Sequence, residues 1–304
     1  MRALAAALVF LVLAGPAYAD DEPSAAAAFD SPQYVTISGY NGDAMEPFLS
    51  RDGQTLFFNN LNDPKVNTDI YYATRIDTLH FAFQGPVDKV NTDKALEGVP
   101  SMDRDGHFYF ISPRDYNWTL ATVWRGVYSS GRVDGARLAD GDLSLGAPGW
   151  FTMDAEISAD GYTLYATDNR RRRFGGGVPD TSLFFLADRI GPGQFRRSQA
   201  TAFIMRLVND PDALQYAAAT SDDERTLYFT RFYSERSDMG IWVATRSDKM
   251  QPWGVPERIT AIKGAAEAPT VTPDNCGIYF HKREIDGLFH VLYAHRTACG
   301  GGDQ

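Results

Sequence analysis

The sequence predicts an all-β protein built as a five-bladed β-propeller, and three observations lead to this prediction. A segment of two short strands joined by a tight turn occurs five times along the chain. A third strand follows each copy, and one strand near the N-terminus has no hairpin of its own. A repeat of about 50 to 60 residues with this content is typical of propeller blades rather than helical solenoids.

The hairpin is clearest in its first copy, which reads MEPFLSRDGQTLFF. An acidic residue and a proline precede a short strand, a Ser-x-Asp-Gly turn and a second, apolar strand. The position after the turn aspartate must accept a positive φ, which glycine and asparagine tolerate and which Glu224 fits least well. The copies are Met45–Phe58, Val99–Ser112, Asp154–Asp168, Tyr216–Arg231 and Ala268–Lys282, with turn positions Gly53, Gly106, Gly161, Glu224 and Asn275.

The third strands are rich in aromatic and β-branched residues, as sheet strands commonly are. Fourth strands carry an aromatic residue followed three positions later by proline, which suits an outer edge because a missing N–H breaks no central ladder there. This mark occurs at Phe83/Pro86 and Trp253/Pro256 and, degraded, at Phe195/Ser198, and we expect another outer strand within Gly131–Gly149. Third strands are expected at 69–75, 121–129, 182–189, 240–246 and 289–296.

The same mark also occurs before the first hairpin, at Phe29/Pro32, whereas no fourth strand follows the fifth hairpin. We therefore predict that Gln33–Ser38 completes the last blade, with Tyr34–Ile37 pairing to Val291–Ala294. This closure of the ring removes two exposed sheet edges. A six-bladed ring is the alternative, because the long stretches between the second and fourth turns have room for extra strands.

The chain is expected to contain one domain after an export signal. Arg2, the apolar run Leu4–Ala14 and a small-residue cleavage site predict a signal peptide over residues 1–19, cut after Ala19. That run is too short to span a bilayer, and no later segment is apolar for long enough. We therefore expect a monomeric periplasmic or secreted protein without a transmembrane segment. The expected parts are the signal peptide 1–19, a flexible leader 20–28, the propeller domain 29–297 and a flexible tail 298–304.

Charge and cysteine content narrow the class of partner and the compartment. The formal net charge of −10 argues against nucleic acid or an anionic membrane surface as a general partner. Cys276 and Cys299 are the only cysteines, and in an oxidising compartment an even count favours a disulfide. A two-residue turn at Asp286-Gly287 places Cys276 opposite position 297, within reach of Cys299. Two free thiols are the alternative.

The pattern EPxxSxDGxxLxF followed by DIYYATR resembles the WD-like β-propeller repeats of the TolB type, over nearly the whole chain after the signal peptide. The match is best in the first, third and fifth copies. The second copy loses one residue after the turn, and the fourth replaces Asp-Gly with Asp-Glu. Such repeats serve as scaffolds, ligand-binding domains and appendages of peptidases. The resemblance implies an exported propeller that recognises a protein or a small ligand.

In a blade, the start of the first strand and the end of the second lie on one face, where charged side chains are expected to gather. We predict a polar mouth over the central channel that binds an envelope protein or a carbohydrate. The alternative is one acid–base pair per blade that serves the scaffold. Glu46 is distinctive, because Asn59 and Asn60 replace the base in its blade. The acids are Glu46, Glu97, Glu156 and Glu267, and the bases are Arg114, Arg170, Arg231 and Lys282.

Four consecutive arginines lie in an insertion of the third blade, at 168–180. Guanidinium groups suit phosphates, carboxylates and acidic partners, although a solvated loop is the alternative. The predicted binding surface consists of Glu46, Arg114, Arg170, Arg171, Arg172, Arg173, Arg231 and Lys282.

Enzyme signatures are mostly absent, since the chain has no GxSxG, HExxH, phosphate-loop or CxxC motif. The sequence therefore favours a binding module and predicts no cofactor. The rival hypothesis is a glycoside hydrolase or lyase with paired carboxylates at the channel mouth. A metal shared by His281 and His290 is a weaker hypothesis, because a site normally needs three or four ligands. The candidate catalytic acids are Glu46, Glu97, Asp154, Glu156 and Glu267.

Overall fold

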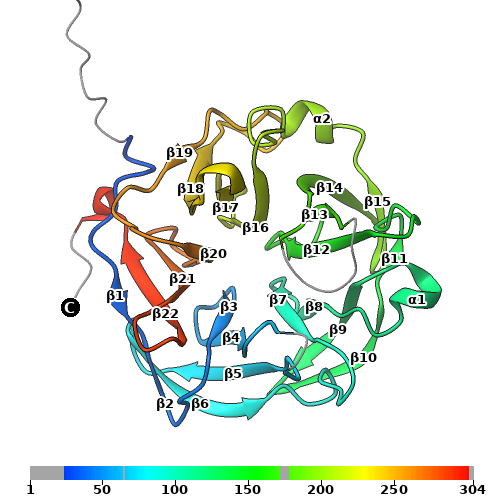
Figure 1. Cartoon of the computed structure of the whole chain (residues 1–304), viewed down its shortest axis with the longest axis horizontal. Coiled ribbons are helices and arrows are strands. Elements are labelled where there is room, and N and C mark those ends of the chain that lie inside the picture. The colour runs from blue at the N-terminus through cyan, green and yellow to red at the C-terminus, as the bar shows by residue number, and fades with distance from the viewer. Residues whose placement is uncertain (1–23, 64–65, 172–177, 301–304) are drawn as a thin grey trace, which may run out of the picture.

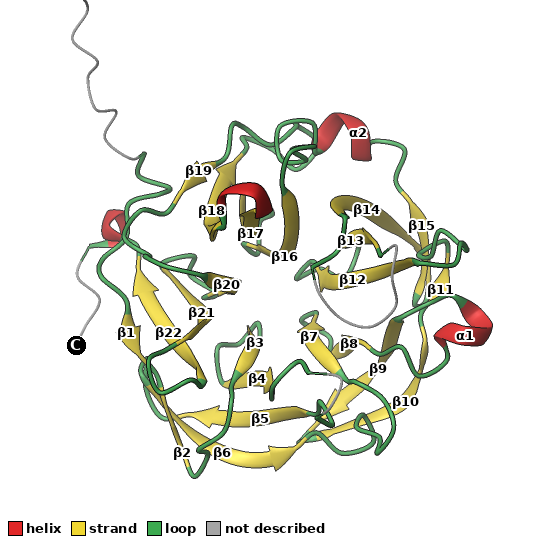
Figure 2. Ribbon diagram, in the orientation of Figure 1, coloured by secondary structure: helices red, strands yellow, loops and turns green. Residues whose placement is uncertain are grey.

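The computed structural model describes residues 24–63, 66–171 and 178–300, and the backbone forms a ring of five sheets around a central channel (Figures 1 and 2). This confirms the predicted five-bladed β-propeller, and the described residues contain no sixth blade. None of the described helices is long and apolar enough to cross a membrane.

Each blade has four antiparallel strands that run outward from the channel, and blades 1 and 3 gain a fifth strand at the outer edge. Blade 1 contains β3 (Met45–Leu49), β4 (Thr55–Asn59), β5 (Ile70–Arg75), β6 (His80–Pro86) and β2 (Thr36–Ser38). Blade 2 contains β7 (Gly98–Met102), β8 (His107–Ile111), β9 (Val123–Ser129) and β10 (Arg132–Leu138). Blade 3 contains β12 (Trp150–Ile157), β13 (Thr163–Arg170), β14 (Thr181–Gly191), β15 (Gln194–Arg197) and β11 (Asp140–Gly141). Blade 4 contains β16 (Leu214–Thr220), β17 (Thr226–Tyr233), β18 (Asp238–Thr245) and β19 (Glu257–Arg258). Blade 5 contains β20 (Ala266–Val271), β21 (Gly277–Arg283), β22 (Phe289–His295) and β1 (Gln33–Tyr34). Short helices lie between strands at α1 (Tyr116–Thr119), α2 (Thr201–Ile204), η1 (Ser234–Arg236) and η2 (Thr297–Cys299).

The recurring turn is held by its own side chains. In blade 1 the hydroxyl of Ser50 donates to Oδ1 of Asp52 (2.5 Å), which also accepts the N–H of Gln54 (3.0 Å). The next position has a positive φ in every blade, as predicted, including Glu224 (54°). Glu224 is fixed by its surroundings, because its carboxylate accepts the hydroxyl of Tyr165 (2.7 Å) in the neighbouring blade.

The hydrophobic core is divided among the contacts between blades. Five clusters of buried apolar side chains each combine residues of two neighbouring blades. Between blades 1 and 2, for example, Phe57 of β4 packs against Phe108 of β8 with ring centroids 5.2 Å apart. The blades are therefore stabilised mainly by their neighbours, which is why the ring must close.

Closure follows the prediction only in part. Tyr34 of β1 pairs with Leu292 of β22, and the N–H of Val35 donates to the oxygen of Val291 (3.0 Å). The prediction was wrong for Thr36–Ser38, which forms β2 and pairs in parallel with β6 of blade 1. The N-terminal segment therefore bridges blades 5 and 1. Val35 is buried in the apolar cluster shared by these two blades. Burial of this side chain favours a path of the N-terminal segment from blade 5 to blade 1.

Both ends of the described chain contact the propeller. Ala27 is 1% exposed, and the oxygen of Ala28 accepts the N–H of Thr297 (3.1 Å), so residues 24–28 pack against the propeller. Cys276 and Cys299 form the predicted disulfide, which fixes η2 to blade 5. The expected signal peptide, residues 20–23 and residues 301–304 lie outside the described part of the chain.

The register of the last hairpin differs by one residue from the predicted one. The N–H of Gly287 donates to the oxygen of Glu284, and Lys282 pairs with His290, so the loop is longer than the predicted two-residue turn. Side chains alternate between the two faces of a sheet. A shift of one residue therefore places side chains of the two strands that were expected on the same face on opposite faces.

Candidate functional site

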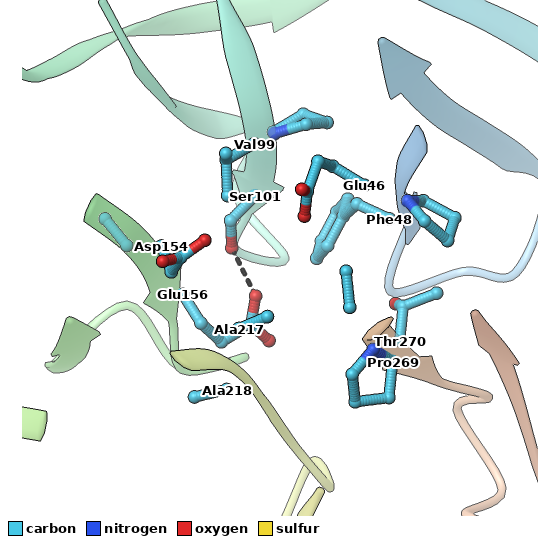
Figure 3. A pocket seen from close by; sticks show the side chains of 14 residues that line it. Glu46, Phe48, Val99, Ser101, Asp154, Glu156, Ala217, Ala218, Pro269 and Thr270 are labelled. Atoms are coloured by element: carbon cyan, nitrogen blue, oxygen red, sulfur yellow. Dashed lines mark hydrogen bonds between the residues drawn. The ribbon is translucent and has the colours of Figure 1, made fainter. Parts of the chain in front are cut away.

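A bulge in each inner strand decides which side chains face the channel. The bulged residue has a positive φ and stands at the same distance before the turn in all five blades. Glu46 and Asp154 occupy this position in blades 1 and 3. Figure 3 shows both side chains projecting into the space between the inner strands. We name the face where the inner strands begin the mouth face, and the opposite face, which carries the hairpin turns, the turn face.

Three carboxyl groups meet near the mouth face. Burial raises the pKa of Glu46 well above its usual value, and the charges of Asp154 and Glu267 raise it further. Burial also raises the pKa of Asp154 to about 7, although the hydroxyl of Thr167 donates to its Oδ2 (3.3 Å). The pKa of Glu267 is raised by burial and lowered in part by the hydroxyl of Tyr216, which donates to Oε2 (2.6 Å). Burial therefore makes these groups ionise less readily than exposed carboxyl groups do.

A buried histidine completes the cluster. The N–H of Glu46 donates to Nδ1 of His281 (3.0 Å), which is 0% exposed. Burial lowers the pKa of His281 to about 3, so the ring is neutral and Nε2 carries its hydrogen. Nε2 lies 3.9 Å from Oε1 of Glu267, too far for a hydrogen bond. Within the part of the chain that the structure describes, neither Nε2 of His281 nor the buried Oε2 of Glu46 has a hydrogen-bond partner.

Arg51, in the hairpin turn of blade 1, spans the turn-face end of the channel. Its guanidinium donates to Oε1 of Glu156 (2.6 Å) and to the backbone oxygen of Ile157 (2.6 Å) in blade 3. It also donates to the oxygen of Met102 (3.2 Å) in blade 2 and that of Thr220 (3.2 Å) in blade 4. Because these atoms lie at or near the ends of three inner strands, Arg51 ties four blades together at the turn face.

The channel is narrow at the level of the carboxyl groups. The space open to water there is about 30 Å³. This is enough for about one or two water molecules or a group of similar size. It is lined by Glu46, Phe48, Val99, Ser101, Asp154 and Glu156, among others (Figure 3).

A larger cleft of about 830 Å³ lies on the mouth face beside the channel, and Val99 borders both. Polar side chains of loops in blades 1 and 2 form one wall, and Leu96 and Met153 form apolar parts of the surface. An adjoining cavity of about 400 Å³ is lined by Tyr116, Phe151 and Arg171. The polar wall contains Asn62, Asn67, Asp93, Lys94, Arg114 and Asn117.

The four predicted glutamates do not occupy equivalent positions. Glu97 forms the expected pair with Arg114 (3.4 Å) in blade 2. Glu156 lies near the turn face and pairs with Arg51 instead of Arg170, so the alternative of one equivalent acid–base pair per blade does not hold in blade 3. The error arose because the bulge is invisible in the hydrophobic pattern. Counting back from the turn residue of each hairpin would have shown that Glu46 and Asp154 occupy the same position of the repeat.

The predicted basic residues also lie in different environments and do not form one surface. Arg171 and Arg114 border the cleft, whereas the guanidinium of Arg170 lies over Trp150 (5.6 Å). Arg231 is buried and donates to the backbone oxygen of Val208 (2.7 Å), and Lys282 pairs with Glu284 (3.0 Å). Arg172 and Arg173 lie outside the described residues.

The predicted pairing of His281 with His290 was wrong. His281 stands opposite Val291, and His290 opposite Lys282, so the two imidazoles occupy neighbouring rows on opposite faces of the sheet. His290 pairs with Asp286 (2.8 Å) at the surface. Among the described residues, no group of three or more His, Cys, Asp or Glu side chains is arranged to hold a metal ion.

No protein-family profile matches the chain, and no curated protein sequence matches it either. Solved structures with a similar backbone include the catalytic domain of a family 62 α-L-arabinofuranosidase from Coprinopsis cinerea. It is 11% identical, with a TM-score of 0.53, and the match covers 89% of this chain and 97% of that one. A family 117 glycoside hydrolase from Zobellia galactanivorans is 11% identical, with a TM-score of 0.55 and coverage of 88% and 91%. TolB from Acinetobacter baumannii is 16% identical, with a TM-score of 0.48, and the match covers 84% of this chain and 55% of TolB, so the chain spans about half of that protein. At these identities the likeness to the two glycoside hydrolases, with TM-scores above 0.5, concerns the fold alone.

Proposed function

We propose that the protein is an exported binding module that holds a carbohydrate in the mouth-face cleft, with the channel opening at its base. The observation that carries the proposal is the cleft of about 830 Å³ beside carboxyl groups that form no ion pair with any described lysine or arginine. Small-ligand sites commonly have this size and combine apolar walls with a few polar groups. A protein partner would be favoured by a broad, flatter surface.

The composition of the cleft suits a sugar. Its hydroxyl groups need donors and acceptors, which the amides of Asn62, Asn67 and Asn117 supply together. The C–H faces of a sugar ring pack on apolar surface, which Leu96 and Met153 offer.

Export is supported by the disulfide between Cys276 and Cys299, because disulfides persist mainly in oxidising compartments. The N-terminal pattern of residues 1–19 agrees with this. We therefore propose that the protein acts as a monomer in a periplasm or outside the cell.

Glycoside hydrolysis is a second candidate function, and one observation favours it. Glu46 and Asp154 have raised pKa values, as the general acid of a glycosidase requires. Several proteins with this fold are described as glycoside hydrolases. The space of about 30 Å³ at the carboxyl groups is too small for a sugar ring, which is why binding is the first proposal.

The test is isothermal titration calorimetry of the purified protein against a panel of neutral, acidic and amine-bearing oligosaccharides. At least one member should bind, and the Asn117→Ala variant should bind it at least tenfold more weakly. Gln84→Ala is the matched control, because Gln84 is an exposed amide on outer strand β6. Absence of binding to every member, or equal binding by Asn117→Ala, would reject the proposal. Release of reducing ends by the wild type and not by Asp154→Asn would establish the second candidate instead.

A further inference from the structure

We propose that the channel mouth binds the ammonium group of an amino sugar, which is the part of the ligand that enters the channel. This inference rests on the proposed carbohydrate-binding function and names the substrate class. The site consists of Glu46, Asp154 and Glu267, with Tyr216 and His281 beside them, and we call it the carboxyl cluster.

The carboxyl cluster differs from the other buried carboxylates of the described chain, each of which has a basic partner. Glu97 pairs with Arg114 (3.4 Å), Glu156 with Arg51 (2.6 Å) and Glu224 with Arg246 (3.7 Å). Asp103 pairs with His107 (2.7 Å). Within the described residues, no lysine or arginine lies within ion-pair distance of the three members of the cluster. A buried carboxylate without a counter-charge is costly, so the cluster is suited to a cation supplied by a ligand.

Two buried atoms of the cluster have no hydrogen-bond partner among the described residues. In ionised Glu46, Oε2 is an acceptor that lacks a donor, whereas Nε2 of His281 is a donor that lacks an acceptor. Buried polar atoms are rarely left in this state. A ligand that carries an ammonium group next to a hydroxyl group satisfies both, since the ammonium donates and the hydroxyl accepts. Amino sugars have this pair of neighbouring groups.

The dimensions of the site agree with this class. The space of about 30 Å³ beside Glu46 and Asp154 accepts an ammonium group and excludes a sugar ring. The ring and the rest of the oligosaccharide would remain in the cleft of about 830 Å³, which Val99 connects to the channel. An N-acetylated sugar presents a larger, uncharged group at the same position. Size and charge therefore both favour the free amine.

Binding should depend on pH, because protons and the ligand compete for the carboxyl groups. The titratable groups that line the space are Glu46 of β3, Asp154 of β12 and Glu156 of β12, whose carboxylate pairs with Arg51. Glu267, Tyr216 and His281 face these groups from β20, β16 and β21: the N–H of Glu46 donates to His281, Tyr216 donates to Glu267, and the charge of Glu267 acts on Glu46. His281 remains neutral over this range, since its pKa is about 3. The pKa of Asp154 is about 7, so acidification from pH 7.0 to 5.5 protonates it and removes the attraction for the ammonium group. Affinity should therefore fall with decreasing pH.

The experiment is calorimetric titration of the full chain with glucosamine oligosaccharides and with N-acetylglucosamine oligosaccharides of the same length. At pH 7.0 the free-amine form should bind at least tenfold more tightly, and the preference should shrink at pH 5.5. Asp154→Asn and, independently, Glu46→Gln should abolish the preference. Asp134→Asn is the matched control, because Asp134 is an exposed carboxylate on outer strand β10.

The outcomes separate the two proposals. Equal binding of both oligosaccharides, or a preference that survives both cluster variants, overturns the ammonium site and leaves carbohydrate binding intact. Failure of both oligosaccharides to bind while another glycan binds in the cleft also overturns it. If no glycan binds, the proposed carbohydrate-binding function is overturned as well. Thermal unfolding of each variant shows whether a loss of binding comes from misfolding.

Discussion

Replacing Arg51 with methionine is expected to destabilise the propeller by about 3–5 kcal/mol, the usual cost of removing one partner of a buried ion pair. The side chain of Arg51 is 6% exposed and that of Glu156 is 7% exposed. Without Arg51, the carboxylate of Glu156 keeps the hydroxyl of Ser101 (2.6 Å) as its side-chain donor. The backbone oxygens of Met102 and Ile157 lose donors as well. Methionine retains much of the volume, so the measured cost reflects the lost charge and hydrogen bonds.

The loss of folding stability in Arg51→Met should depend on pH. Burial raises the pKa of Glu156, and the charge of Arg51 holds it down, so removing Arg51 raises this pKa further. A carboxyl group with a raised folded-state pKa contributes stability below its unfolded-state pKa and loses it as the pH rises through the folded-state value. The destabilisation of Arg51→Met should therefore be larger at pH 8 than at pH 5.

Urea unfolding followed by circular dichroism at both pH values measures these differences. The double variant Arg51→Met/Glu156→Gln should regain part of the stability at pH 8, since glutamine stays neutral. Lys89→Met is the control, because Lys89 is 50% exposed and pairs with Asp134 (3.0 Å), which is 51% exposed. Such a pair contributes about 0–1 kcal/mol. A cost below about 1 kcal/mol for Arg51→Met, or one equal at pH 5 and pH 8, would refute the reasoning.

Three further predictions concern stability. Asp154→Asn should stabilise the protein at pH 8 by up to about 4 kcal/mol and have little effect near pH 4, because the folded-state pKa is about 7 against an ordinary 3.8; equal unfolding curves at pH 8 would contradict this. Serine at both Cys276 and Cys299 should cost about 3 kcal/mol through the entropy of the freed loop, and reductant should lower the wild-type Tm to that of the variant. A wild-type Tm insensitive to reductant speaks against that expectation. Val35→Pro removes the N–H donated to Val291 and should lower the Tm by several degrees, whereas an unchanged Tm would show that β1 and β2 do not hold the ring closed.

Local sequence patterns predicted most of the strands. The segment expected at 69–75 forms β5 (Ile70–Arg75), and the outer strand expected within Gly131–Gly149 is β10 (Arg132–Leu138). The Ser-x-Asp turn also followed from the sequence, because its hydrogen bonds join residues two positions apart. Such short-range contacts leave a direct trace in the order of the residues.

Register and pairing were harder to predict. The last hairpin shifted by one residue because its loop is longer than the Asp-Gly motif suggested, and the shift moved His281 away from His290. Thr36–Ser38 pairs with blade 1 instead of blade 5. This pairing depends on burial of Val35 between two blades that are far apart in the chain. Neither contact is encoded by a neighbouring residue.

The sequence by itself determined the number of blades, the hairpins, the turn chemistry and the disulfide partners, because each depends on spacing along the chain. Only the tertiary structure decided that the charges of Asp154 and Glu267 act on Glu46, while Glu156 is neutralised by Arg51. The physical reason is that these groups come from different blades, and their ionisation depends on burial and on charges that the closed ring brings within a few ångströms of one another.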